Sequence, residues 1–346
     1  MKPMAMLVLI MSLIVGTTIA LSSHHWLLAW AGLEVNTLAI IPLMTVTPHP
    51  RAIEAATKYF LTQAAASALM LFTAITNASM FGEWQISSLS TSLSIPLTMA
   101  LCMKLGLAPL HFWMPEVLQG IPLTTGLILS TWQKIAPMAL LIQISGTTNL
   151  FLTTTFGLTS IIIGGWGGLN QTQLRKIMAF SSISHMGWIL LIMMFNQTLA
   201  LLGFILYIIM TTTTFLFLMS LNITKMLQIP MAWPVTPPLT LIFLLTLLSL
   251  GGLPPLTGFA PKLFIMMDLV QQKNLILACT ALLASVPALY FYIRLTYILL
   301  LITPPTIIYS KMAWRLPLKK SLIVSTMAPP AILLLPITPT IMTLIY

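Results

Sequence analysis

Charged residues are scarce in this sequence. Of its 346 residues only 6% are charged, whereas 58% are hydrophobic, and the mean hydropathy is +1.01. A soluble domain carries about 25% charged residues, so this chain has too few of them to cover an aqueous surface. The composition therefore excludes a soluble globular protein and predicts an all-α polytopic membrane protein.

Cysteines and catalytic motifs are also scarce. Cys102 and Cys279 fall in separate apolar segments, so they indicate neither a disulfide framework nor a metal site. The net charge is +10, but the basic residues are scattered without interleaved aromatic residues, which argues against nucleic-acid binding. The glycine-rich stretch at 164–176, GGWGGLNQTQLRK, lacks the spacing of a phosphate-binding loop and a preceding strand. Close helix packing explains its glycines better.

Long apolar runs make up most of the chain. A run of about 18–25 residues can span a bilayer as a helix. Turn residues separate these runs, and the N-terminal run has no cleavage site before a soluble domain, so we expect it to be retained as the first helix. We predict about eleven transmembrane helices: 4–21, 25–46, 58–78, 95–115, 123–143, 149–170, 175–195, 198–221, 239–268, 274–302 and 322–344.

The basic residues between these helices predict an orientation. With eleven spans, ten of them fall on the face that holds the N-terminus, and only Lys273 falls on the other. Positive charges are retained on the cytoplasmic face or on its mitochondrial equivalent, the matrix. We therefore expect the N-terminus on the cytoplasmic face or its matrix equivalent, and the C-terminus on the opposite face.

Several ionisable residues fall inside the predicted spans. Lys104 and Lys134 lie about 14 and 17 Å into their helices, near the middle of a hydrocarbon core about 30 Å thick. Glu34 and His185 fall at a similar depth. Each charge at this depth costs about 2.5–3.5 kcal/mol on insertion scales. Two interpretations follow: ion pairs that tie helices together, or a pathway for protons or other ions.

Two predicted spans contain helix-breaking sequences. Gly-Leu-Ala-Pro-Leu at 106–110 follows Lys104, and Gly-Leu-Pro-Pro-Leu at 252–256 precedes Lys262. Unwound backbone within a membrane is tolerated where protein or water surrounds it. Five spans separate the two breaks near 106–109 and 252–258, so they have opposite orientations. This favours two inverted five-helix repeats, 1–147 and 148–305, followed by a loop and an eleventh helix at 306–346.

His111 is a further candidate, because it follows Lys104 by seven residues and would share a face with it in an unbroken helix. The break between them leaves a second interpretation open, in which His111 is a buried histidine satisfied by a neighbouring hydroxyl.

Four stretches carry a resemblance to a known family: MKLGLAPLHFWMPEV at 103–117, STWQKIAP at 130–137, GGLNQTQLRKIMAFSSISHMGW at 167–188 and LSLGGLPPLTGFAPK at 248–262. The chain resembles, essentially end to end, the antiporter-like membrane subunits of vertebrate mitochondrial NADH–ubiquinone oxidoreductase, respiratory complex I. The resemblance implies proton translocation from the matrix to the intermembrane space, driven by electron transfer elsewhere in the complex.

The resemblance also implies roles for particular residues. In that family a glutamate pairs with a lysine on a broken helix and further lysines extend a polar axis, which here gives Glu34, Lys104, Lys134 and Lys262, with His185 as a relay between the halves. Flavin mononucleotide, iron–sulfur clusters and ubiquinone belong to other parts of the complex, and we expect none of them on this chain.

Partners and location follow from the same resemblance. It implies a multi-pass protein of the mitochondrial inner membrane, in contact with the neighbouring antiporter-like and small membrane subunits. The family's longer members have fourteen helices, so this chain lacks three at the N-terminus and leaves a flank for another subunit. The basic loop at 311–320 is expected to bind a cardiolipin-type lipid or to be a solvated loop ordered by partner chains.

Two alternatives remain at this stage. The chain can be a passive structural or assembly subunit that seals the membrane arm while its neighbours pump. It can also be a subunit of a free-standing cation/proton antiporter, which sodium-dependent activity of the isolated chain would support.

Overall fold

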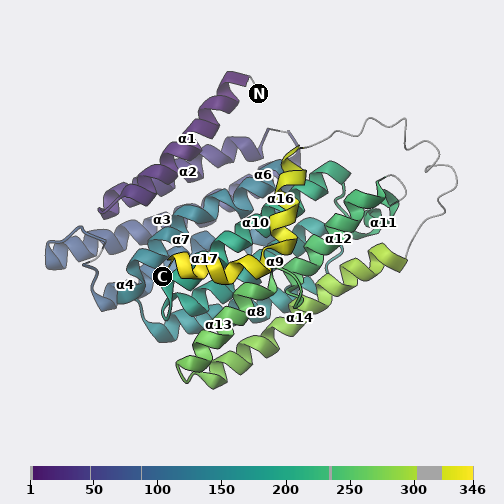
Figure 1. Cartoon of the computed structure of the whole chain (residues 1–346). Helices are drawn as coiled ribbons and strands as arrows, with labels where there is room; N and C mark the ends of the chain where they lie inside the picture. The colour runs from purple at the N-terminus through teal and green to yellow at the C-terminus, as the bar shows by residue number, and fades with distance from the viewer. Residues whose placement is uncertain (1–2, 47, 87, 234–235, 302–321, 346) are drawn as a thin grey trace. The chain divides into compact units, whose positions relative to one another are not determined.

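Helices account for most of the chain in the computed structural model, which describes residues 3–46, 48–86, 88–233, 236–301 and 322–345 (Figure 1). The predicted basic loop at 311–320 lies outside these residues. The α-helices are α1 (Pro3–Ser22), α2 (Trp26–Met44), α3 (Pro50–Phe81), α4 (Thr91–Leu105), α5 (Trp113–Gly120), α6 (Leu123–Ser130), α7 (Trp132–Ile144), α8 (Leu150–Gly168), α9 (Leu174–Met193), α10 (Gln197–Leu221), α11 (Ile229–Ala232), α12 (Pro237–Gly251), α13 (Phe259–Gln271), α14 (Leu275–Leu301), α16 (Leu322–Leu333) and α17 (Thr338–Ile345).

The predicted membrane spans are present as helices. Among the described residues, eight helical stretches are long and apolar enough to cross a bilayer, and α16 with α17 forms a ninth that bends by 62°. The helices α4 and α12 are also apolar but shorter, because each ends at a predicted break. Each of the eleven predicted runs overlaps one of these helices, so the all-helical polytopic fold is confirmed.

Several helix boundaries differ from the prediction. The third helix begins at Pro50 rather than at residue 58, since the His49 side chain accepts a hydrogen bond from the Arg51 amide and Pro50 occupies the first turn. The fifth span is interrupted at Thr131, between α6 and α7, and the last span bends after Leu333. Hydropathy detects apolar runs, and it misses polar first turns and breaks that lie within apolar sequence.

The two predicted breaks share one local geometry. Gly106 and Gly252 have φ angles of 74° and 80°, a left-handed conformation that favours glycine after a helix end. The next residue's amide bonds back to the carbonyl five residues earlier, at 3.0 Å for Leu107 and 3.4 Å for Leu253. The following helices, α5 and α13, each begin seven residues after the glycine. The similar sequences at the two breaks therefore fold in the same way.

Contacts along the chain group the residues into two units, Met1–Ser160 and Ile161–Tyr346. In the first unit, the loop after α1 forms an isolated bridge with the loop after α3, between His25 and Gln85. In the second, the loop after α8 forms the same kind of bridge with the segment after α10, between Gln173 and Lys225. Each unit therefore contains one such bridge between two of its loops, and the division into repeats at 147/148 stays a prediction.

Close glycine packing occurs in each unit as well. A Cβ atom at Gly16 on α1 would lie 2.9 Å from the Gly32 carbonyl oxygen on α2, and one at Gly164 on α8 would lie 2.9 Å from the Phe180 carbonyl oxygen on α9. Gly167 and Gly168 likewise lie against aromatic rings that leave no room for a side chain. The packing interpretation of the glycine-rich stretch at 164–176 is thus confirmed.

Candidate functional site

Lys104 lies in the last turn of α4, directly before the first break. The residue is 6% exposed, and its Nζ atom has no hydrogen-bond partner among the described residues. The partial negative charge at a helix C-terminus stabilises a nearby cation. The C-terminal end of α4 therefore stabilises the positive charge of Lys104 without a direct contact.

Trp113, the first residue of α5, closes the break that follows Lys104. Its indole Nε1 donates to the Met103 carbonyl at 3.1 Å. Its ring packs edge-on against Tyr59 of α3, with ring centroids 5.6 Å apart. A Cβ at Gly106 would lie 3.2 Å from the same indole, so the glycine also permits this close approach. Trp113 thus joins the end of α4 to both α5 and α3.

Lys134 lies on α7, three residues after the break at Thr131, and is 3% exposed. The Thr131 hydroxyl donates to the Leu127 carbonyl at 2.7 Å, which satisfies a carbonyl near the end of α6. The neighbouring Gln133 amide donates to the Asn36 carbonyl at 3.2 Å and ties α7 to α2. The unpredicted break therefore presents Lys134 at the start of a new helix, beside the helix that carries Glu34.

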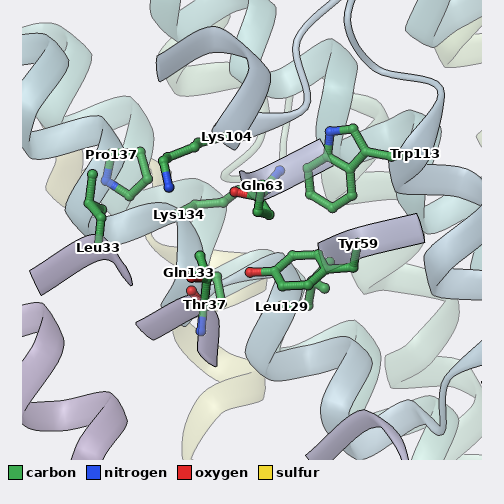
Figure 2. Close-up of a pocket in the computed structure, with 10 residues that line it drawn as sticks. All are labelled: Leu33, Thr37, Tyr59, Gln63, Lys104, Trp113, Leu129, Gln133, Lys134 and Pro137. Atoms are coloured by element: carbon green, nitrogen blue, oxygen red, sulfur yellow. The ribbon is translucent and has the colours of Figure 1, made fainter. Parts of the chain in front are cut away.

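The two lysines share one cavity, which we call the first cavity (Figure 2). Figure 2 shows both side chains reaching the same space from α4 and α7. Four further polar side chains from α2, α3 and α7 line it, so a buried polar interior lies within a unit of apolar helices. The lining residues are Leu33, Thr37, Tyr59, Gln63, Lys104, Trp113, Leu129, Gln133, Lys134 and Pro137.

Glu34 lies beside the first cavity on α2, between the lining residues Leu33 and Thr37. Its carboxylate attracts the Lys104 ammonium electrostatically. No ion pair within 4.0 Å joins the two in the described part of the chain, and the Glu34 Oε2 atom has no hydrogen-bond partner there. The carboxylate and the ammonium thus interact across a gap.

A second cavity in the second unit contains His185 and Lys262 together. His185 lies on α9 and is 8% exposed, with its ring 6.0 Å from that of Tyr207. The remaining wall comes from α8, α9, α12 and α14. Its lining residues are Ile161, Ser184, His185, Trp188, Leu250, Lys262, Ser285, Ala288 and Tyr292. Each unit therefore holds a cavity with at least one lysine.

Lys262 reaches back across the second break. It lies on α13, and its Nζ donates to the Gly251 carbonyl at the end of α12, at 2.9 Å. A Cβ at Gly252 would lie 2.7 Å from that Nζ, so the glycine also leaves room for the ammonium. Lys262 thus stabilises a helix end in addition to lining the cavity.

His111 lies within the first break and is 5% exposed. Its Nδ1 lies 3.3 Å from the Pro109 carbonyl, which accepts a hydrogen bond when that nitrogen is protonated. It is not one of the ten residues that line the first cavity. The structure therefore gives His111 a backbone partner, whereas the sequence interpretation had considered a hydroxyl.

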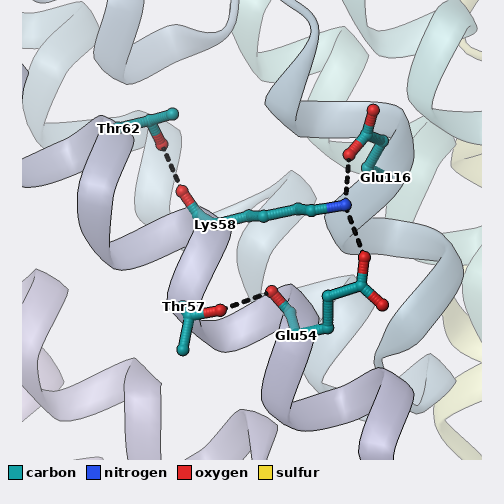
Figure 3. A network of polar contacts seen from close by, with 5 residues as sticks. All are labelled: Glu54, Thr57, Lys58, Thr62 and Glu116. Atoms are coloured by element: carbon teal, nitrogen blue, oxygen red, sulfur yellow. Dashed lines mark hydrogen bonds and ion pairs between the residues drawn. The ribbon is translucent and has the colours of Figure 1, made fainter.

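An exposed ion triad joins α3 to α5 (Figure 3). The Lys58 Nζ lies 2.6 Å from a Glu54 oxygen and 2.7 Å from a Glu116 oxygen, and all three side chains are largely exposed. Tyr59 follows Lys58 in sequence, and Trp113 precedes Glu116 by one turn. The triad therefore links, through exposed ion pairs, the two helices that supply the aromatic wall of the first cavity.

Proton transfer is the chemistry that these groups best support. Lysine, histidine and glutamate side chains can bind and release protons, and the amide and hydroxyl groups can orient them. Within the described residues, no group of three or more His, Cys, Asp or Glu side chains is arranged to hold a metal ion.

Sequence reasoning missed several groups at the first cavity. Tyr59, Gln63 and Trp113 were not selected, although Tyr59 and Gln63 are four residues apart and so share one face of α3. The polar Gln63 inside an otherwise apolar run was the available signal. The helix that packs against this face of α3 can be identified only in the folded structure.

Comparisons with known proteins agree with these features. Residues 23–288 match the family model described as NADH:quinone oxidoreductase/Mrp antiporter, TM, and residues 289–342 match the NADH dehydrogenase subunit 2 C-terminus. NADH-ubiquinone oxidoreductase chain 2 of Aquarana catesbeiana is 60% identical over 344 residues, covering 99% of this chain and 100% of that protein. The same chain of Osphranter robustus is 52% identical and covers 100% of both.

Solved structures are similar in fold. A chain of respiratory complex I from Thermus thermophilus with bound aureothin matches with a TM-score of 0.81 and 25% identity, covering 97% of this chain and 80% of that one. A chain of the Mrp complex from Dietzia matches with a TM-score of 0.77 and 18% identity, over 83% of this chain and 59% of that one. At that identity, the second match shows the shared fold alone.

Proposed function

The chain belongs to the NADH:quinone oxidoreductase/Mrp antiporter family and is a membrane subunit of NADH:ubiquinone oxidoreductase, and we propose that it translocates protons. Protons would pass from the matrix to the intermembrane space, and electron transfer elsewhere in the complex would supply the energy. Flavin, iron–sulfur clusters and ubiquinone are assigned to other subunits in this proposal.

The observation that supports this proposal most is the presence of two lysines in one buried polar cavity. Lys104 and Lys134 come from different helices, and both are less than a tenth exposed. Placing each charge at such a depth costs about 2.5–3.5 kcal/mol. An apolar residue would avoid this cost, so retention of both lysines favours a functional role over a purely structural one.

In the proposed route, one set of groups transfers a proton within the first cavity and another set does so within the second. Glu34 stabilises a proton on Lys104, and Lys134 accepts that proton within the first cavity. A carboxylate near a buried lysine favours the charged form of that lysine, so moving the carboxylate away favours release of the lysine's proton. His185 and Lys262 would carry out the corresponding transfer in the second cavity, and His111 is assigned a minor role at the first break.

Lys134→Met tests this proposal. Methionine fills a similar volume but cannot bind a proton, so we expect fewer protons translocated per NADH oxidised. The complex is reconstituted in liposomes, and proton uptake is measured together with NADH oxidation. Lys273→Met, at an exposed position at the end of α13, is the matched control and should leave the ratio unchanged.

A passive structural role is the second candidate, and one observation favours it. Lys262 donates to the Gly251 carbonyl and so acts as a tie between α12 and α13. Full proton stoichiometry in Lys134→Met would support the passive role. A free-standing cation/proton antiporter is disfavoured, because full-length relatives that are 52–60% identical are chains of NADH-ubiquinone oxidoreductase.

The proposal also places the chain in the cell. The mitochondrial inner membrane is its expected location, with the N-terminus in the matrix and the C-terminus in the intermembrane space. Its proposed partners are the neighbouring antiporter-like and small membrane subunits. Lipid binding at 311–320 stays a prediction from sequence.

A further inference from the structure

Gln63 is a buried polar residue that the proposed route does not use. It lies on α3 and is 3% exposed, and its Nε2 atom finds no hydrogen-bond partner among the residues that the structure describes. Figure 2 shows Gln63 among the side chains that line the first cavity, which include Lys134 and Trp113. Buried side-chain amides nearly always have a partner, either protein or ordered water. An unsatisfied amide therefore indicates that a further molecule belongs here.

Two more groups around this cavity lack partners in the described part of the chain. They are the Nζ of Lys104 and the Oε2 of Glu34. An ammonium can only donate hydrogen bonds and a carboxylate can only accept them, whereas an amide does both. A glutamine that lines the same cavity as Lys104 can therefore act, through a water molecule, as a link between the donor and the acceptor, which do not contact each other directly.

The cavity has a size that suits water. It offers room for about one water molecule in addition to its lining side chains. Its wall is polar on the α3 and α7 sides, through Gln63, Tyr59 and Gln133. A polar cavity of this size has room for one water molecule, and its polar groups are suitable partners for it.

The position of α3 makes it suitable for linking Glu34 and Lys104. Tyr59 and Gln63 lie on the same face of this helix, and both line the first cavity. The Glu34 carboxylate acts electrostatically on Tyr59 as well as on Lys104. The face of α3 that carries Gln63 thus lines the same cavity as Lys104 and lies within the electrostatic influence of Glu34.

We propose that Gln63 is a positioning residue that holds a water molecule in the first cavity and so connects Glu34 with Lys104. The inference rests on the proposed function, because it matters only if protons move through this cavity. Gln63 itself gains and loses no proton. Its amide orients the water, and the ammonium and the carboxylate remain the exchanging groups.

A structural role and the proposed role predict opposite effects of Gln63→Met. Methionine has a similar length and removes the unsatisfied amide, so packing alone predicts equal or greater stability and normal turnover. Our proposal predicts that the complex assembles normally while NADH-driven proton translocation falls by about tenfold, since the water is no longer held in place. Gln63→Asn keeps an amide in the cavity and should retain more activity than Gln63→Met.

The experiment compares four complexes in liposomes: native, Gln63→Met, Gln63→Asn and Gln143→Met, the last at an exposed position of α7. Assembly, NADH oxidation and proton uptake are measured for each. Ordered water density within hydrogen-bond distance of the Gln63 amide in the native complex would support the proposal. Equal translocation by Gln63→Met and native complexes would overturn it.

Lys134→Met separates this inference from the proposed function. If Lys134→Met lowers proton stoichiometry while Gln63→Met has no effect, the role of Gln63 is wrong and the proposed function stands. If neither variant changes translocation, both are wrong.

Discussion

Lys104→Ala is expected to lower NADH-driven proton translocation by about a hundredfold, the size of effect typical of removing a positioned proton-transfer group. Lys104 lines the first cavity, and its ammonium has no hydrogen-bond partner among the described residues, so the variant breaks no hydrogen bond of this side chain there. The variant also removes a buried charge. We therefore expect the complex to assemble in normal amounts.

The measurement is proton uptake by liposomes that contain the purified complex, with the assembled amount determined on native gels. Lys273→Ala, at an exposed site, serves as the control. A complex that fails to assemble with Lys104→Ala would support a structural role for this lysine instead.

Gly258→Ala is expected to prevent stable folding at the second break. A Cβ atom at Gly258 would collide with the backbone carbonyl oxygen of Ser249 and would lie 2.7 Å from the carbonyl carbon of the same residue, so the clash is with backbone rather than with a flexible side chain. Overpacking of this kind costs about 3 kcal/mol or more, a large fraction of the stability of most proteins. The chain should then be missing from the assembled complex.

Gly146→Ala is the matched control, because a Cβ atom at Gly146 would meet nothing within 4 Å. The amount of each variant in the complex is compared on native gels after growth at two temperatures. Equal assembly of the two variants would show that the second break adapts to a side chain, contrary to the packing described.

The breaks near 106–109 and 252–258 were predictable because their signals are local. Glycine after a helix end and proline soon afterwards act within a few residues, whatever the rest of the fold does. The break at Thr131 has no glycine or proline at that point, and its neighbours are ordinary helix formers. The local signals that reveal the other two breaks are therefore absent at Thr131.

The candidate site was predictable in part for a similar reason. Lysines at mid-membrane depth are conspicuous against an apolar background, so Lys104, Lys134 and Lys262 could be selected from sequence alone. Their surroundings could not be predicted. Gln63 comes from another helix, and the contact between Lys262 and Gly251 depends on how the chain folds back after the break.

The Lys58 triad illustrates the same limit. From sequence, Lys58 was only one of ten positive charges that set the orientation. Its second partner, Glu116, is 58 residues away, so the contact between α3 and α5 becomes visible only in the folded chain. The sequence shows that position 58 carries a positive charge, but it does not identify the residue that pairs with it.

The most direct test of the account is the number of protons translocated per NADH oxidised by the Lys104→Arg complex. Arginine keeps the positive charge but does not release its proton in proteins, so it separates electrostatic support from proton exchange. We predict fewer protons per NADH than in the native complex at matched rates of electron transfer. An unchanged ratio would contradict the claim that Lys104 exchanges protons.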